Sequence, residues 1–217
     1  MTLLDTIFYI NLEKRKDRLA HVQEELAKLG IPGERVCAIE TSDGAIGCTL
    51  SHIRCLEMAK QRNLPHVFIC EDDITFLNPQ LLLTNVDRFE KSGLDWEVLI
   101  IGGNNVPPYT QISNFCIQVS NNQTTTGYVV RQKFYDTLIA NFKESAAKLI
   151  RNPDQRRQYA LDIYWKSLQT SGKWYMIIPP TVVQYEDYSD IEKRNVDYRG
   201  LLLDLNKSWI FRNKMSF

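Results

Sequence analysis

Short apolar runs alternate with amphipathic segments through the first half of the chain. The runs are rich in β-branched and aromatic residues, which predicts buried strands at 6–10, 35–39, 65–70 and 97–101. Between them apolar residues recur at helical spacing, which predicts helices at 17–29, 45–61 and 79–91. Asp17 is expected to cap the first helix, and the sequence from Gly30 to Gly33 to end it. Strands that alternate with helices are typical of the α/β class, so we predict a mostly parallel central sheet flanked by helices.

The second half of the chain shows a less regular pattern. Residues 104–113 are polar and contain prolines, and we expect a loop there. Further strands are predicted at 115–119, 126–130 and 174–178, and helices at 132–149 and 153–170. At 217 residues the chain is long enough for one domain with a sizeable core.

Charge and composition narrow the class of partner. The chain has 26 basic and 26 acidic residues, and this balance argues against general binding to nucleic acid or to an anionic membrane surface. No apolar run approaches the length of a membrane-spanning helix, and the first residues do not resemble a signal peptide. The five cysteines are scattered without a Cys-x-x-Cys pair, which favours reduced thiols and a cytoplasmic location.

Three consecutive carboxylates, Glu71, Asp72 and Asp73, directly follow a predicted buried strand. At about 5 Å and an effective dielectric constant near 20, each like-charged pair costs roughly 3 kcal/mol. The segment must therefore be open to water, hold a proton or bind a cation. Carboxylate oxygens suit Mg²⁺ or Mn²⁺, which also bridges the oxygens of a diphosphate. The alternative is a solvated acidic loop that caps the next helix.

Ligands of such sheets bind beyond the carboxyl ends of the strands, here at 11–18, 71–73 and 102–105. Asn11, Arg15 and Arg18 fall in the first of these segments, and an arginine side chain suits phosphate oxygens. The alternative for the arginines is a solvated basic face. Gly102 would permit close backbone approach to a sugar, or would simply form a turn.

Cys48, His52 and Cys55 share one face of a predicted helix, and their spacing would suit zinc. No fourth ligand is evident nearby, and the helix has an apolar face to bury. We therefore favour two core cysteines beside a functional His52.

Several motifs, taken in order, resemble glycosyltransferase family 25, which includes bacterial lipooligosaccharide galactosyltransferases and collagen galactosyltransferases. The resemblance rests on segments 9–18, 44–52, 69–73 and 125–130, on Asp162, on Gln184 and on 189–191. It implies a single GT-A-like (Rossmann-like) nucleotide-binding domain spanning 1–217, with a donor half at 1–103 and an acceptor-side half at 104–217. It also implies a UDP-sugar donor that carries galactose or glucose, and a glycan or glycoprotein as the acceptor. The implied cofactor is Mn²⁺ or Mg²⁺, and the implied reaction inverts the configuration at the anomeric carbon.

The resemblance also assigns residues to this chemistry. Glu71 and Asp73 are the expected metal ligands, and the residues expected near the donor are Asn11, Arg15, Arg18, Ser51, His52, Asp72, Gly102, Thr126 and Gly127. An inverting transfer needs a carboxylate that takes the acceptor proton. Asp162 is the first candidate for this base, with Glu186 and Asp187 as rivals.

Two other functions remain open on the sequence. One is a non-catalytic module that binds a nucleotide-sugar. The other is a metal-dependent phosphohydrolase or nucleotidyltransferase, which would need a second cluster of metal ligands or a glycine loop carrying a lysine. We find neither in the sequence.

Overall fold

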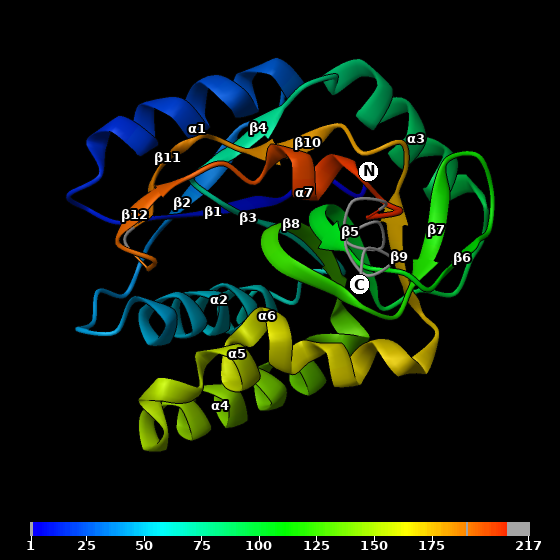
Figure 1. Cartoon of the computed structure of the whole chain (residues 1–217). Helices are drawn as coiled ribbons and strands as arrows, with labels where there is room; N and C mark the ends of the chain where they lie inside the picture. Colours follow the sequence, from blue (N-terminus) through cyan, green and yellow to red (C-terminus); the bar gives the residue numbers. More distant parts are fainter. Residues whose placement is uncertain (1, 190, 208–217) are drawn as a thin grey trace, which may run out of the picture.

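The computed structural model describes residues 2–189 and 191–207 of the chain. An eight-stranded sheet with the order β2-β1-β3-β8-β5-β9-β7-β6 forms its centre (Figure 1). The strands are β1 (Ile7–Asn11), β2 (Gly33–Cys37), β3 (His66–Glu71), β5 (Val98–Asn105), β6 (Tyr109–Gln111), β7 (Cys116–Val119), β8 (Asn122–Arg131) and β9 (Trp174–Ile177).

Most strands of this sheet share one direction. β1 pairs in parallel with β2 and with β3, and β5 pairs in parallel with β9. β8 lies antiparallel between β3 and β5, and β7 lies antiparallel between β9 and β6. The predicted α/β class with a mostly parallel central sheet is confirmed, and the insertion of β8 makes the pairing mixed.

Helices cover both faces of the sheet (Figure 1). On one face lie α1 (Lys16–Leu29) and α3 (Pro79–Lys91), and on the other lie α2 (Gly44–Gln61), α4 (Tyr135–Arg151), α5 (Arg156–Tyr159) and α6 (Leu161–Tyr164). The strands are apolar at successive positions because both faces are buried. In β1, Ile7 and Tyr9 belong to the core beneath α1, whereas Phe8 and Ile10 belong to the core beneath α2.

The same alternation along β3 decides where the first carboxylate points. Val67 and Ile69 pack in the core on the α2 side, and Phe68 and Cys70 pack on the α1 side. Successive side chains of a strand point to opposite faces. Glu71, the last residue of β3, therefore faces α2 together with Val67 and Ile69.

Smaller elements bring the C-terminal part of the chain to the end of β3. β4 (Ile74–Phe76) pairs with β10 (Val182–Gln184), and β11 (Asp187–Ser189) pairs with β12 (Arg194–Val196). A short helix, α7 (Arg199–Leu203), follows. None of the helices in the described ranges is long and apolar enough to cross a membrane.

Three expectations about elements were wrong. The segment 104–113 is not simply a loop, because β5 continues to Asn105 and β6 follows. The segment 153–170 is not one helix, because Ala160 has an extended backbone with ψ 144° that separates α5 from α6. Two 3₁₀ helices, η2 (Pro153–Gln155) and η3 (Trp165–Ser171), flank them. Asp17 does not cap α1, since Arg15 occupies the cap position and Asp17 lies in the first turn.

Candidate functional site

The acidic segment lies where β3 ends, beside the carboxyl end of the parallel strand β1. Asp72 is buried, and its carboxylate accepts hydrogen bonds from the Asn11 amide at 2.7 Å and the Arg18 guanidinium at 3.1 Å. Asn11 is itself fixed, because its amide oxygen accepts a hydrogen bond from Arg35 at 3.0 Å. Burial nevertheless raises the pKa of Asp72, and the charge of Arg18 only partly offsets this effect.

Asp73 is also buried and has weaker partners. Arg18 lies 3.4 Å from one carboxylate oxygen, and the Gln184 amide lies 3.4 Å from the other. The backbone carbonyl of Asp73 accepts a hydrogen bond from the Tyr185 N–H at 2.6 Å, which ties β4 to the end of β10. Burial, together with the nearby charge of Glu71, raises the pKa of Asp73 to about 8.

Glu71 is held on the other side of the strand. Its carboxylate accepts a hydrogen bond from the Thr125 hydroxyl of β8 at 2.5 Å and lies 3.4 Å from Nε2 of His52 in α2. Burial opposes ionisation of Glu71, but contact with His52 and the Thr125 hydroxyl lowers its pKa. Glu71 therefore stays ionised while the neighbouring Asp73 tends to hold a proton.

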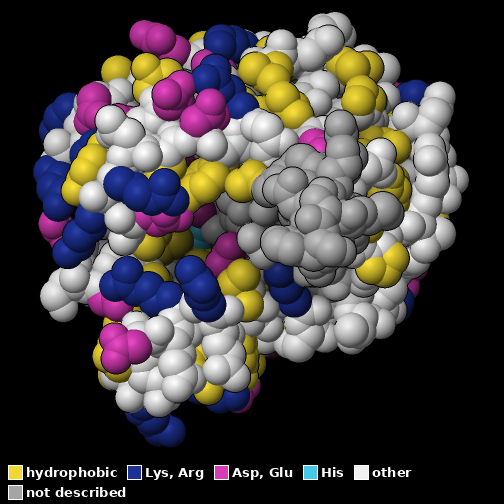
Figure 2. Space-filling model, in the orientation of Figure 1, with side chains coloured by type: hydrophobic (Ala, Val, Ile, Leu, Met, Phe, Trp, Pro, Cys, Tyr) yellow, Lys and Arg dark blue, Asp and Glu magenta, His cyan; other side chains and the backbone are white. Residues whose placement is uncertain are grey.

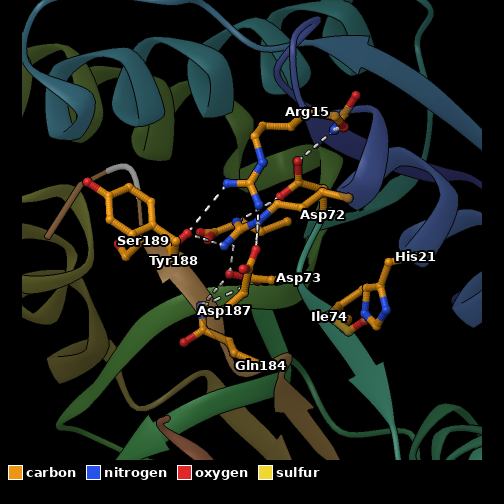
Figure 3. A network of polar contacts seen from close by, with 12 residues as sticks. Arg15, His21, Asp72, Asp73, Ile74, Gln184, Asp187, Tyr188 and Ser189 are labelled. Atoms are coloured by element: carbon orange, nitrogen blue, oxygen red, sulfur yellow. Dashed lines mark hydrogen bonds and ion pairs between the residues drawn. The ribbon is translucent and has the colours of Figure 1, made fainter. Parts of the chain in front are cut away.

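Arg18 connects the acidic segment to the hairpin of β11 and β12, and Arg15 contacts the same hairpin. Figure 3 shows Arg15, Asp187 and Tyr188 close to Asp72 and Asp73. Asp187 of β11 forms ion pairs with both guanidinium groups. The backbone carbonyl of Tyr188 accepts hydrogen bonds from Arg15 at 3.4 Å and from Arg18 at 3.1 Å. Two arginines predicted to contact a donor diphosphate are thus held by an acidic side chain and a carbonyl from the same chain.

The carboxylate oxygens of the acidic segment are suitable ligands for a hard divalent cation. Asp72 and Asp73 offer buried carboxylate oxygens, and the only guanidinium among the described residues that bonds to either is that of Arg18. The raised pKa of Asp73 reflects negative charge that Arg18 does not neutralise. Oxygen ligands with surplus negative charge are what Mg²⁺ and Mn²⁺ prefer.

The three candidates for the base differ in their surroundings. Asp162 in α6 accepts a hydrogen bond from the Thr124 N–H at 3.0 Å, and burial, with the charge of Glu71, raises its pKa. Glu186 is exposed and pairs with Arg199 at 2.7 Å. Burial opposes ionisation of Asp187, but the Tyr188 N–H and the two arginines lower its pKa. A base that works near neutral pH needs a raised carboxylate pKa, which favours Asp162.

The other predicted residues lie in the interior and take part in packing or local hydrogen bonds. The Ser51 hydroxyl donates to the Gly47 carbonyl at 2.7 Å and accepts from the Ile39 N–H at 2.8 Å. Thr126 and Gly127 are in the middle of β8 rather than at a strand start. A β-carbon at Gly102 would lie 2.6 Å from Val182, and one at Gly127 would lie 2.9 Å from Ile74, so both glycines permit close packing.

Two residues of the site were not assigned a role from the sequence. Gln184 contacts Asp73, and Tyr188 contacts both Arg15 and Arg18. Gln184 is one of the residues on which the resemblance to family 25 rests, and this was the available signal for it. Tyr188 contributes only its backbone carbonyl, which no side-chain pattern reveals.

The surface is hollowed beside the hairpin of β11 and β12 (Figure 2). Charged side chains surround this hollow between the hairpin of β11 and β12 and the helices α5 and α6 (Figure 2). Two cavities of about 280 Å³ and 340 Å³ lie elsewhere, the first beside Gly33 and the second beside His66. Neither is lined by any of the predicted site residues.

The chain is similar to two procollagen galactosyltransferases. A procollagen galactosyltransferase 2 of Homo sapiens is 27% identical over 161 residues, which are 58% of this chain and 26% of that protein. The Mus musculus protein of the same name is 29% identical over 128 residues, 45% of this chain and 20% of that protein. The chain thus spans about a quarter of the length of these relatives or less.

The chain is also similar to a solved structure. The crystal structure of a glycosyltransferase involved in the glycosylation of the major capsid of PBCV-1 has a TM-score of 0.48 and 11% identity, covering 79% of each chain.

The model of glycosyltransferase family 25 (LPS biosynthesis protein) matches residues 40–154, which is more than half of the chain and includes the acidic segment. The chain belongs to glycosyltransferase family 25.

Proposed function

We propose that this chain is a glycosyltransferase that moves galactose or glucose from a UDP-sugar to a hydroxyl group of a glycan or glycoprotein, with inversion and with Mn²⁺ or Mg²⁺. The observation that carries this proposal is the buried acidic segment at the end of β3 within the part of the chain that matches family 25. The name of the human relative supports galactose as the sugar.

In this proposal Asp72 and Asp73, together with Glu71, hold the cation. Asn11 and Arg18 keep the Asp72 carboxylate oriented, and Gln184 does the same for Asp73. When bound, Mn²⁺ or Mg²⁺ supplies positive charge at the diphosphate oxygens and stabilises the leaving UDP. Asp73 must lose its proton before it can hold the cation.

Arg15 and Arg18 bind the donor diphosphate in exchange for Asp187 and the Tyr188 carbonyl, while Arg18 keeps its contact with Asp72. Both guanidinium groups now contact Asp187 and the Tyr188 carbonyl. A diphosphate carries more charge than one carboxylate and accepts hydrogen bonds in the same geometry, so it can displace Asp187. Donor binding would then release the hairpin of β11 and β12 from the two arginines.

Asp162 takes the proton of the acceptor hydroxyl. Its carboxylate is oriented by the Thr124 N–H, and burial raises its pKa toward the neutral range in which a base is effective. The charge of Glu71 acts on Asp162, which supports a position close to the acidic segment.

The proposal is tested first by thermal unfolding of the protein with UDP-, GDP- and CDP-sugars, each with Mn²⁺ or with a chelator. A ligand at 100 times its dissociation constant stabilises the native state by about 2.7 kcal/mol. We expect UDP-galactose or UDP-glucose to raise the unfolding temperature with Mn²⁺ and to have little effect with the chelator. Absence of any UDP-sugar effect would contradict the proposed donor.

The second test measures products after incubation with the stabilising donor and a set of glycan and glycoprotein acceptors. We expect UDP and a glycoside of inverted configuration, and we expect Asp73→Asn to lose most of this activity. Asp95→Asn, which changes a surface carboxylate paired with Lys133 and Lys173, is the matched control and should keep it. Release of UMP would instead indicate a phosphohydrolase, and donor binding without any product would indicate a non-catalytic module.

A further inference from the structure

Two side chains of α2 and one from the end of β3 converge beside the acidic segment. Cys48 and His52 lie one turn apart on the same face of α2, and Glu71 faces this helix. The Cys48 sulfur, an imidazole nitrogen of His52 and a carboxylate oxygen of Glu71 all lie within 4.8 Å of one another. Cys55, which the sequence grouped with the first two residues, is instead fully buried in the apolar core.

The two ring nitrogens of His52 have different surroundings. His52 is fully buried, and its Nδ1 lies 2.8 Å from the hydroxyl of Tyr128. Its Nε2 has no partner with hydrogen-bond geometry among the described residues, and it lies 3.4 Å from the Glu71 carboxylate. A buried, unpaired nitrogen aimed at a carboxylate oxygen is suited to share a cation with it.

Neighbouring hydroxyl groups orient two of these side chains. In the tautomer that would bind a cation, Nδ1 donates its proton to the Tyr128 hydroxyl, and Nε2 presents its lone pair to the cation. The Thr125 hydroxyl donates to the Glu71 carboxylate at 2.5 Å. Metal-binding histidines and carboxylates commonly have such outer partners, which fix the tautomer and the orientation of the ligand.

We propose that Cys48, His52 and Glu71 form a binding site for one thiophilic divalent cation, Zn²⁺ or its probe Co²⁺. A thiolate, an imidazole and a carboxylate are typical zinc ligands, whereas Mg²⁺ and Mn²⁺ prefer oxygen. Three protein ligands leave the fourth tetrahedral position for water, as in catalytic zinc sites.

The site requires little rearrangement. Zinc bonds of about 2.0–2.3 Å at tetrahedral angles place ligand atoms roughly 3.3–3.8 Å apart. The three ligand atoms lie within 4.8 Å of one another, so they would have to move about 1 Å closer together to bind zinc. Rotation of the Cys48 side chain can supply this movement. Burial raises the pKa of the Cys48 thiol, so cation binding breaks its S–H bond, forms a metal–sulfur bond and releases the proton to water.

Glu71 would belong to both cation sites. Zinc at Cys48 and His52 would draw Glu71 away from the Mn²⁺ or Mg²⁺ held with Asp73. Zinc should therefore inhibit sugar transfer. This inhibition rests on the proposed function, whereas zinc binding does not.

Binding is tested by titrating the reduced, metal-free full chain with Co²⁺ and recording its absorption spectrum. We expect a thiolate-to-cobalt charge-transfer band that saturates at one Co²⁺ per chain and is displaced by Zn²⁺. Cys48→Ser should abolish the band. Thr125→Val should weaken Co²⁺ binding by about 10–100-fold, which is the usual loss when an outer partner is removed.

Two control variants locate the site. Cys37→Ser removes an exposed thiol and should leave the band unchanged. Asp73→Asn changes the hard-cation site and should also leave it unchanged. Absence of the band in the wild-type chain, or its persistence in a folded Cys48→Ser variant, would overturn the assignment.

Inhibition is tested in the product assay at fixed Mn²⁺ with increasing Zn²⁺. We expect Zn²⁺ to suppress UDP release by the wild-type chain, and Cys48→Ser to need at least about tenfold more Zn²⁺ for the same effect. Equal sensitivity of the two proteins would refute inhibition through this site. If the chain transfers no sugar, the proposed function fails while the cobalt band still decides whether the metal site exists.

Discussion

Replacement of Asp73 by Asn should stabilise the metal-free protein, although Asp73 belongs to the proposed active site. The pKa of this carboxyl group rises from 3.8 in a free side chain to about 8 in the folded protein. An acid whose folded-state pKa is raised destabilises the folded protein as pH rises above the unfolded value. The cost begins near pH 4, grows with pH and levels off above about pH 8.

The expected magnitude follows from proton linkage. Each pH unit above 3.8 costs about 1.4 kcal/mol until the folded group ionises, which gives an upper limit of roughly 4 kcal/mol at pH 7. The charge of Glu71 contributes to the raised pKa of Asp73, so part of this cost belongs to the interaction between the two carboxylates rather than to Asp73 alone. Arg18 also loses one of its partners in the variant. We therefore expect a net gain of about 2 kcal/mol or more, or at least roughly 4 °C in the unfolding temperature of a domain of this size.

Calorimetric or circular-dichroism melts in a chelating buffer between pH 4 and pH 8 would measure this gain. The difference in unfolding temperature between Asp73→Asn and the wild type should be near zero at pH 4 and should increase toward pH 8. Addition of Mn²⁺ should raise the unfolding temperature of the wild type and reduce its difference from that of Asp73→Asn. An Asp73→Asn protein that melts at or below the wild-type temperature at pH 7 would refute the argument. Such a result would mean that Arg18 and Gln184 fully satisfy the ionised carboxylate.

Three further predictions concern binding, turnover and packing. Arg15→Ala should weaken UDP binding in calorimetric titration by about ten- to a hundredfold through loss of a charge-assisted hydrogen bond, and unchanged affinity would mean that Arg15 only holds the hairpin of β11 and β12 through Asp187. Asp162→Asn should lower turnover by about 10²–10⁴-fold with UDP affinity nearly unchanged, whereas Glu186→Gln should stay close to wild type. If Asp162→Asn keeps its turnover while Glu186→Gln loses it, the base is Glu186. Gly102→Ala should destabilise the fold in urea unfolding by about 1–3 kcal/mol, because its β-carbon would lie 2.6 Å from Val182. Gly200→Ala, with no atom within 4 Å of the added carbon, is the control and should not destabilise, so equal losses would contradict the packing argument.

Local patterns were enough to place most of the early elements. The strand before Glu71, the helix over 79–91 and the stop after Leu29 follow from side-chain periodicity and from proline and glycine, which act over a few residues. The sequence also singled out the acidic segment, because adjacent carboxylates after a buried strand need a compensating partner wherever the rest of the chain lies. The family resemblance added the expectation of a nucleotide-sugar site.

The partners of those carboxylates were decided by tertiary structure. Arg15 and Asp187 meet although 172 positions separate them, and no short-range pattern encodes that contact. The insertion of β8 between β3 and β5 places Thr125 and Tyr128 beside Glu71 and His52. Strand order depends on which long-range pairings bury the most apolar surface, a quantity that belongs to the whole chain.

The sequence by itself therefore determined which side chains could carry charge and chemistry, and roughly where each local element begins and ends. Only the tertiary structure decided that Glu71 faces α2 while Asp72 and Asp73 face Arg18. The physical reason is that the alternation of side chains along a strand is a local property. Which helix or loop covers each face of the strand is instead set by the packing of segments that are distant in the sequence.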